Sequence, residues 1–255
     1  MAARFFVDLP LHSGAAFALP AGPARHVQVL RLQPGAAITL FDGRAGEWRA
    51  TVTQMGRSSV SVQVGAHDGV DRELALPVTL ALGMPANERM DAVVEKATEL
   101  GAGAIQPLLC ERSVLRLAGE RAQKKVAHWQ AVALAACEQS GRTRVPRIAP
   151  VCTLADWLRD LPLIAGAPSE AGATAEAGAA RWMLSLRDAA PLHAAGMAPA
   201  GVICLSGPEG GLSPAEEDAA RSAGFTAVSL GPRVLRADTA PLAVLAHLGL
   251  RQPFG

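Results

Sequence analysis

The sequence lacks the features of membrane, secreted and metal-binding proteins. No apolar run among its 255 residues is long enough to cross a bilayer, and the N-terminal stretch MAARFFVDLPLHSG has no long apolar segment of a signal peptide. The four cysteines include no C-x-x-C pair, which argues against a metal site or a disulfide framework. We therefore expect a cytoplasmic protein with no metal and no membrane partner, and we expect most of its cysteines to be small core residues: Cys110, Cys137, Cys152 and Cys204.

Three common motifs for nucleotide binding or catalysis are also absent. The chain has no G-x-x-x-x-G-K-S/T, which disfavours a nucleoside triphosphate site, and no G-x-G-x-x-G, which disfavours a dinucleotide site. It has no G-x-S-x-G, which argues against an ordinary α/β hydrolase.

The charge is small overall but unevenly distributed. The net charge is +1, yet residues 106–147 hold eight Lys/Arg and three Glu, a local balance of +5. Of the 24 basic residues, 21 are arginine, the side chain best suited to bidentate phosphate contacts. An alanine-rich, arginine-rich chain can also reflect genomic base composition, so charge alone leaves nucleic-acid binding open.

The apolar pattern predicts two domains, residues 1–72 and 73–255. The first reads as a small β-barrel, with one short helix near Pro23 and strands at 38–41, 48–53 and 59–64. In the second, strands alternate with helices at 88–100 and 119–140, which indicates a parallel sheet covered by helices; its strands are expected at 78–83, 104–109, 182–186, 202–205 and 226–230. Residues 165–180 are of low complexity and are interpreted as a surface insertion without packed structure.

Helix signals support this division. Asn87 can cap the first helix of the second domain, whose apolar positions Met90, Val93, Val94 and Ala97 keep helical spacing.

The stretch CLSGPEGGLSP, residues 204–214, joins a buried strand to a strong helix start. Ser213 can accept a hydrogen bond from the backbone of Glu216, the Glu216 side chain can reach back, and Pro214 suits the first helical position. Taken alone, GPEGG is more often a plain tight turn. However, ligands bind at such strand ends in open parallel sheets, and open glycines without a lysine can admit a flat, nearly neutral ring.

A second strand end of this kind follows about 25 residues later, in SLGPRVLRADTAPLAVLAHL, residues 229–248. The two loops can therefore form two walls of one slot. Arg233 and Arg236 lie in the second loop, either as functional groups or as a solvated pair.

These residues resemble the ribosomal RNA small subunit methyltransferase E family. The signature is LSGPEGGLSPAEE followed by LGPRVLRADTA, and the resemblance covers nearly the whole chain in order. It extends to RHVQVLRLQPG (25–35), MDAVVEKATELGAGAIQPLLCERSV (90–114) and WQAVALAACEQSGRTRVPRI (129–148). Members of this family are SPOUT-class enzymes that methylate N3 of a uridine in small-subunit (16S) ribosomal RNA.

The resemblance implies an α/β fold class, with an N-terminal PUA-like RNA-binding β-barrel and a C-terminal SPOUT domain containing a trefoil knot. It also implies a homodimer, S-adenosylmethionine as methyl donor, and 16S ribosomal RNA within an assembled or nearly assembled small subunit as partner. The cofactor-binding residues that it implies come from three strand ends: Ser185, Leu186, Leu205, Ser206, Gly207, Glu209, Gly210, Gly211, Leu230, Gly231, Val234, Leu235 and Arg236.

The chemistry of N3 methylation assigns further roles. Uridine N3–H is a weak acid and must lose its proton, and Arg236 can stabilise the negative charge that grows on the uracil carbonyls. Glu138 and Asp238 are the candidate general bases. A hydrogen bond to an arginine is the alternative for Glu138, and a helix cap is the alternative for Asp238, which stands where the family usually has Glu.

The basic residues in the family-like segments are the expected RNA contacts, since such side chains mostly grip phosphates: Arg25, His26, Arg31, Arg112, Arg116, Arg142, Arg144, Arg147 and Arg233. Two other functions stay open. One is an RNA-binding protein that keeps the fold without catalysis, and the other is methylation of a ribose 2′-hydroxyl, as in sister SPOUT families.

Overall fold

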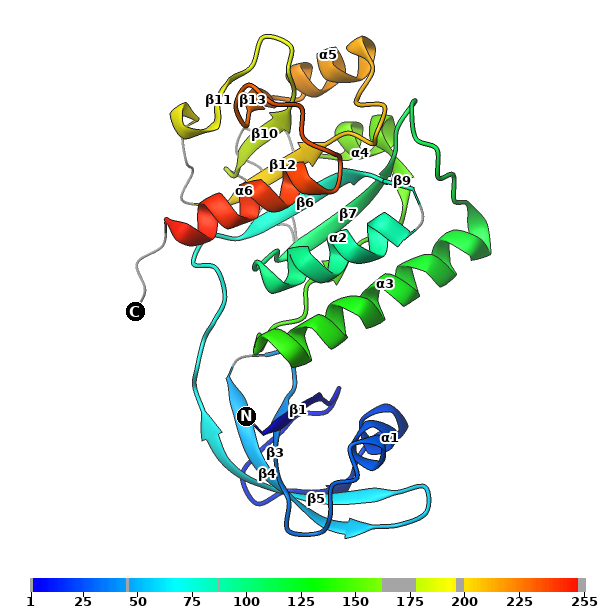
Figure 1. Ribbon diagram of the computed structural model, residues 1–255, viewed down its shortest axis with the longest axis vertical. Coiled ribbons are helices and arrows are strands. Elements are labelled where there is room, and N and C mark those ends of the chain that lie inside the picture. The colour runs from blue at the N-terminus through cyan, green and yellow to red at the C-terminus, as the bar shows by residue number, and fades with distance from the viewer. Residues whose placement is uncertain (1, 45, 87, 162–177, 196–199, 252–255) are drawn as a thin grey trace. The chain divides into compact units, whose positions relative to one another are not determined.

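The computed structural model describes residues 2–44, 46–86, 88–161, 178–195 and 200–251 (Figure 1). The chain forms two compact units, one of residues 1–73 and 134–145 and the other of residues 74–133 and 146–255. The predicted insertion at 165–180 lies outside the described residues except for its last three positions, and so does Asn87, the predicted cap.

The first unit is built on a five-stranded sheet in the order β1-β3-β4-β5-β2. All pairs are antiparallel except β1 with β3. Alternation along β5 buries Val60, Val62 and Val64 and leaves Gln63 outside, as period-two patterning requires. The structure confirms the predicted short helix, α1 (Ala21–Val29), and the three predicted strands, β3 (Ala37–Phe41), β4 (Glu47–Met55) and β5 (Val60–Asp68). Two further short strands, β1 (Ala3–Phe6) and β2 (Ala16–Ala18), were not predicted.

The second unit contains the predicted parallel sheet, in the order β11-β13-β10-β12-β6-β7-β8, with β9 also paired to β7. Every described strand pair in it is parallel. The strand predicted at 182–186 begins and ends two residues earlier, and three two-residue strands were not predicted because they are too short to show a period. The strands are β6 (Val78–Gly83), β7 (Ala104–Leu109), β8 (Arg147–Ile148), β9 (Cys152–Thr153), β10 (Ala180–Leu184), β11 (Ala190–Pro191), β12 (Val202–Ser206) and β13 (Thr226–Ser229).

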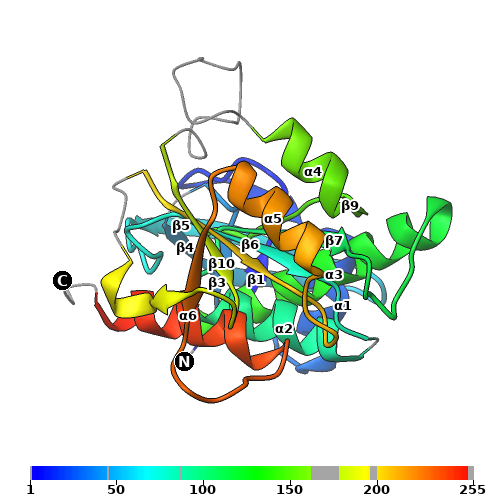
Figure 2. The same cartoon turned by 90° about the horizontal axis from the view of Figure 1, so that it is seen from above.

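Helices cover both faces of this sheet. Seen from above, α4 and α5 lie on one face and α2 and α6 on the other (Figure 2). The predicted apolar stripe of α2, Met90, Val93, Val94 and Ala97, is buried. The helices are α2 (Glu88–Glu99), α3 (Gly119–Ser140), α4 (Leu154–Asp160), α5 (Pro214–Ser222) and α6 (Thr239–Leu250), with a short 3-10 helix η1 (Leu192–Ala194) after β11.

The four cysteines are free thiols, and all but the half-buried Cys152 are buried. Burial raises the pKa of Cys110, Cys137 and Cys204 to about 12. The structure therefore confirms the prediction that most of them are small core residues.

Arg142, a predicted RNA contact, is buried within the first unit. Its Nε donates to Glu73 Oε2 at 2.9 Å, and its side chain is 4% exposed. Arg4 in turn donates to the backbone oxygens of Gly141 and Arg142 at 3.1 and 3.0 Å. This burial argues against the predicted contact, because a guanidinium held by Glu73 inside the protein does not reach a phosphate.

Glu138, a candidate general base, also lies in the first unit. Its Oε1 accepts a hydrogen bond from the backbone N–H of Phe6 at 3.0 Å, and its Oε2 lies 3.6 Å from Nδ1 of His26. Burial raises the pKa of Glu138, although the Phe6 N–H, His26 and Arg4 act to lower it.

The raised pKa predicts a pH-dependent effect of Glu138→Gln. A carboxyl group whose folded pKa is raised stabilises the fold fully below its unfolded pKa, and that contribution is lost as the pH rises through the folded pKa. Glutamine keeps an oxygen for the Phe6 N–H but cannot ionise. The unfolding temperature of the variant should therefore rise relative to the wild type as the pH increases above the ordinary pKa of glutamate, about 4.

Circular dichroism melts across this range measure the effect. Glu120→Gln is the matched control, because the Glu120 side chain is 84% exposed. A difference for Glu138→Gln that stays constant or shrinks with rising pH would contradict the expectation.

Candidate active site

A cavity of about 630 Å³ lies at the carboxyl ends of three neighbouring strands, β13, β10 and β12. Parallel strands end at the same edge of a sheet, so the loops that follow them meet there. The cavity is lined by residues 184–187, 206–212, 228, 230 and 233–237, together with Arg89, Glu217 and Ala240.

Most of the residues predicted to bind a cofactor line this cavity, from all three loops. The two others differ in position: Leu205 is fully buried in the core, and Gly231 lies in the third loop, with φ +112°, outside the lining. Of the predicted catalytic residues, Arg236 lines the cavity, whereas Glu138 and Asp238 do not. Contact of any of these residues with a cofactor or RNA stays a prediction.

The loop of residues 207–211 depends on glycine for its turn. A Cβ added to Gly207 would lie 2.8 Å from Leu212 N and 2.9 Å from the carbonyl carbon of Gly211, closer than real Cβ atoms approach the backbone. Gly211 has φ +68°, a conformation that side chains disfavour. The tight path of the chain, rather than space for a ligand, therefore requires glycine at these two positions.

The carboxylate in this loop anchors it to the segment after β6. Glu209 Oε1 accepts a hydrogen bond from the backbone N–H of Ala86 at 2.9 Å and lies 3.6 Å from Nη1 of Arg89. The acidic residue thus joins two loops that are far apart in the sequence.

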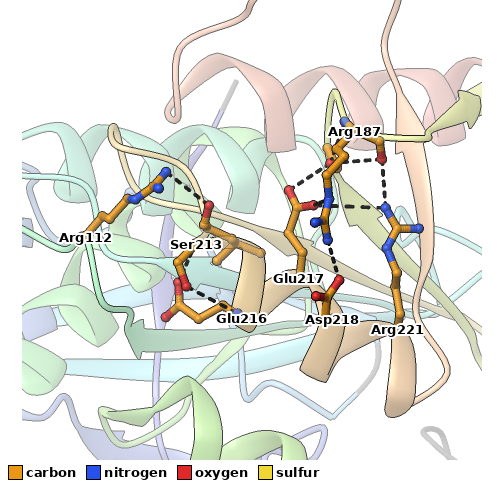
Figure 3. A network of polar contacts seen from close by, with 9 residues as sticks. Arg112, Arg187, Ser213, Glu216, Glu217, Asp218 and Arg221 are labelled. Atoms are coloured by element: carbon orange, nitrogen blue, oxygen red, sulfur yellow. Dashed lines mark hydrogen bonds and ion pairs between the residues drawn. The ribbon is translucent and has the colours of Figure 1, made fainter.

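Arg112 and the capping box of α5 hold the other end of the loop. Arg112 Nη1 donates to the backbone oxygens of Gly210 and Leu212 at 3.0 and 3.3 Å. Ser213 and Glu216 form the predicted capping box (Figure 3). Glu216 also accepts from the backbone N–H of Glu111 at 2.7 Å. The guanidinium predicted to contact RNA is therefore engaged with loop carbonyls.

The loop after β10 is held by the predicted residue Ser185 together with Arg187, Glu217 and Asp218, which were not predicted. Ser185 Oγ donates to Glu217 Oε1 at 2.8 Å, and Arg187 Nε donates to Glu217 Oε2 at 2.9 Å. Arg187 is also paired with Asp218, which is the main cause of its raised pKa. The only signal in the sequence is that Glu217 follows the capping-box residue Glu216.

The arginines that line the cavity fall into two pairs. Arg89 and Arg187 each face a carboxylate, Glu209 and Glu217 respectively. The side chains of Arg233 and Arg236 are exposed and form no hydrogen bond or ion pair with the described residues. Two uncompensated positive charges therefore lie in the third loop.

Asp238 does not cap α6 with its side chain, contrary to the alternative considered for it. The hydroxyl of Thr239 donates to Asp238 Oδ1 at 3.4 Å. Asp238 thus precedes the helix without holding its first turn.

The remaining predicted RNA contacts are exposed side chains: Arg25, His26, Arg31, Arg116, Arg144 and Arg147. Arg116 donates to the backbone oxygen of Glu111 at 3.0 Å, and Arg144 lies 3.4 Å from Asp71. Exposed ion pairs contribute little, so Arg144 can exchange its partner readily.

Within the described residues, no group of three or more His, Cys, Asp and Glu side chains is placed to hold a metal ion. In the same part of the chain, no helix combines the length and apolarity needed to cross a membrane.

Comparison with known families defines the class of protein first. The family described as "RNA methyltransferase domain" matches residues 72–249, and the family described as "RNA methyltransferase PUA domain" matches residues 24–65. The sheet and cavity of the second unit lie within residues 72–249, whereas residues 24–65 cover strands β3 and β4 and most of β5 of the first unit.

Individual relatives then define the family. Ribosomal RNA small subunit methyltransferase E of Bacillus subtilis is 30% identical over 96% of this chain and 95% of its own length, and that of Mycobacterium bovis is 33% identical over 98% and 92%. A crystal structure of ribosomal RNA small subunit methyltransferase E from Neisseria gonorrhoeae bound to S-adenosyl methionine is 35% identical, covers 97% of both chains and has a TM-score of 0.88. The chain belongs to the ribosomal RNA small subunit methyltransferase E family.

The geometry of the glycine loop predicts that Gly207→Ala destabilises the protein. The added methyl would press on backbone atoms of the same turn, which cannot move aside as a flexible side chain can, and such overpacking costs about 1–3 kcal/mol. Urea unfolding, followed by circular dichroism, measures the change.

Gly103→Ala is the control in the same unit, because its added Cβ would make an ordinary contact at 3.6 Å from Val78 O. Equal stability of the two variants would show that the loop relaxes around a side chain at residue 207.

Proposed function

We propose that this protein transfers a methyl group from S-adenosylmethionine to N3 of a uridine in small-subunit (16S) ribosomal RNA. As a member of its family, the chain is an RNA methyltransferase. The observation that carries the proposal is the near full-length likeness to a relative crystallised with S-adenosyl methionine, combined with a cavity at the three strand ends. The N3 position on the base is the more specific part of the proposal, beyond RNA methylation itself.

The residues of the cavity fit an adenosyl ligand. Its volume of about 630 Å³ lies in the range of small-molecule sites. Apolar side chains such as Leu184, Leu230 and Leu235 offer flat surfaces for a ring, and the glycine-rich backbone of 207–211 offers polar groups for its edge. When bound, S-adenosylmethionine supplies a methyl group that its positive sulfur has already activated.

The unpaired arginines suit a uracil ring as the methyl acceptor. Loss of the N3 proton leaves negative charge on the two neighbouring carbonyl oxygens of uracil, and a preorganised cation at that position lowers the barrier. We assign this role to Arg236 and a phosphate contact to Arg233. We assign the proton to Asp238, which follows Arg236 by two residues in the chain. Glu138, the other candidate base, belongs to the first unit, where the Phe6 N–H and His26 face its carboxylate.

The wider assignments follow the same family. We propose that residues 1–72 bind RNA as the PUA-like domain and that residues 73–255 form the SPOUT methyltransferase domain, which contains a knot and pairs with a second copy. Support comes from the two family matches, at residues 24–65 and 72–249. We further propose that the substrate is the RNA of an assembled or nearly assembled small subunit and that the protein acts in the cytoplasm.

Nucleoside analysis tests the proposal. Small ribosomal subunits that lack the modification are incubated with the protein and S-adenosylmethionine, and the digested RNA is analysed by mass spectrometry. We expect 3-methyluridine. A 2′-O-methylated nucleoside would identify a ribose methyltransferase, and RNA binding without heat on titration of S-adenosylhomocysteine would identify a non-catalytic RNA-binding protein.

The role of Arg236 predicts a selective loss of turnover in Arg236→Ala. Removal of one charge-stabilising donor lowers kcat by about 10²–10³-fold. RNA affinity should change little, because phosphate contacts elsewhere position the substrate. Single-turnover rates and filter binding separate the two effects.

Arg251→Ala, at an exposed position just after α6, serves as the control and should leave both quantities unchanged. Comparable losses in turnover and RNA affinity for Arg236→Ala would show that Arg236 grips RNA instead.

A further inference from the structure

The loop after β10 forms one wall of the cavity but has little regular structure of its own. It connects β10 (Ala180–Leu184) with the two-residue strand β11 (Ala190–Pro191). Leu186 lines the cavity and is nevertheless 65% exposed, and Asp188 adopts φ +48°, which is unfavourable for a residue other than glycine. The shape of residues 185–187 must therefore be maintained by contacts with another element.

Glu217 on α5 supplies the central contacts. One carboxylate oxygen accepts the hydrogen bond from Ser185 Oγ at 2.8 Å, and the other accepts from Arg187 Nε at 2.9 Å. Ser185 Oγ in turn accepts from the backbone N–H of Arg187 at 2.9 Å, which closes a small ring of hydrogen bonds. The Glu217 side chain is only 13% exposed, so water competes weakly for these bonds.

Two neighbours of Glu217 on the same helix complete the attachment. Asp218 pairs with the guanidinium of Arg187, and Arg221 Nη2 donates to the backbone oxygen of Arg187 at 2.7 Å (Figure 3). The Asp218 side chain is 65% exposed, so its pair with Arg187 contributes less than the shielded bonds to Glu217.

The same helix also fixes the neighbouring wall, formed by the loop after β12. At its N-terminus, Ser213 and Glu216 form the capping box that ends the glycine loop, and Glu216 reaches the backbone of Glu111. Ala220 of α5 is fully buried in the core cluster, which holds the helix against the sheet. Adjacent residues of one helix, Glu216 and Glu217, thus hold the loops that follow β12 and β10.

We infer that Glu217 is a positioning residue for the methyl donor: it holds the loop of residues 185–187 in the shape that forms a cavity wall. The inference rests on the proposed function, in which S-adenosylmethionine binds in this cavity. Glu217 itself lines the cavity, but both of its oxygens are engaged with the loop, so it acts on the donor through Ser185 and Arg187. Its loss weakens donor binding without touching the reacting atoms.

Steady-state kinetics of Glu217→Ala test the inference. The KM for S-adenosylmethionine should rise about tenfold, the effect of losing hydrogen bonds to a charged partner, while kcat at saturating donor stays within about twofold. The KM for the RNA substrate should not change. Glu217→Gln should fall between the variant and the wild type, because its amide oxygen still accepts from Ser185 but its charge no longer attracts Arg187.

Three further measurements keep the result interpretable. Glu120→Gln, at a side chain 84% exposed on α3, should leave every parameter unchanged. Arg187→Ala should raise the KM for the donor through the same loop, and combining it with Glu217→Ala should give less than the product of the two single effects. Melting temperatures of all variants show whether each one is folded at the assay temperature, and Glu217→Gln, which keeps the size of the side chain, serves if Glu217→Ala is not.

The outcomes separate this inference from the proposed function. Wild-type protein that binds S-adenosylhomocysteine and produces 3-methyluridine, together with folded Glu217 variants of unchanged donor KM, would overturn the inference alone. A fall in kcat at constant KM would also overturn it, because Glu217 would then act in the chemical step. Wild-type protein without donor binding would overturn both.

Discussion

The candidate active site depends on one topological constraint: strands β12, β10 and β13 are parallel neighbours, so all three end at the same edge of the sheet. Chain segments separated by intervening helices therefore meet in one place. Each strand contributes a loop, and the three loops enclose a cavity that none of them could form alone. The core beneath them, which contains Met183, Ile203 and Leu205, keeps the strand ends in register.

Polar side chains then fix the conformations of the loops at this edge of the sheet. The glycine loop carries few side chains that could hold it, so its position is set from outside, by Glu209 to Ala86 and by Arg112 to the carbonyls of Gly210 and Leu212. Helix α5 carries out the same task for the loop after β10. With these groups engaged, only Arg233 and Arg236 of the four lining arginines have no partner among the described residues, which leaves the positive charge of the site on the third loop.

Local sequence patterns predicted much of the secondary structure, but they did not predict contacts between residues that are distant in the sequence. Period-two alternation predicted the strand of β5, helical spacing predicted the buried face of α2, and S-P-A-E predicted the capping box at Ser213. The contacts that shape the cavity join residues 30 to 123 positions apart, such as Arg187 with Glu217 and Glu209 with Ala86, and no local sequence signal reveals them. For the same reason the sequence does not reveal that Arg142 is buried against Glu73, or that the exposed Arg112 donates to backbone oxygens of the glycine loop. The cofactor and the position of methylation came from family resemblance, because periodicity carries no information on either.

The burial of the cysteines has a consequence for a protein that handles an electrophilic methyl donor. Thiolates are strong nucleophiles and would compete with the RNA base for the methyl group, but a thiol with a pKa of about 12 is almost entirely protonated at neutral pH. Cys204, on the strand that ends at the cavity, is fully covered by the sheet. Burial thus keeps Cys110, Cys137 and Cys204 protonated and enclosed, which limits their reaction with the methyl donor.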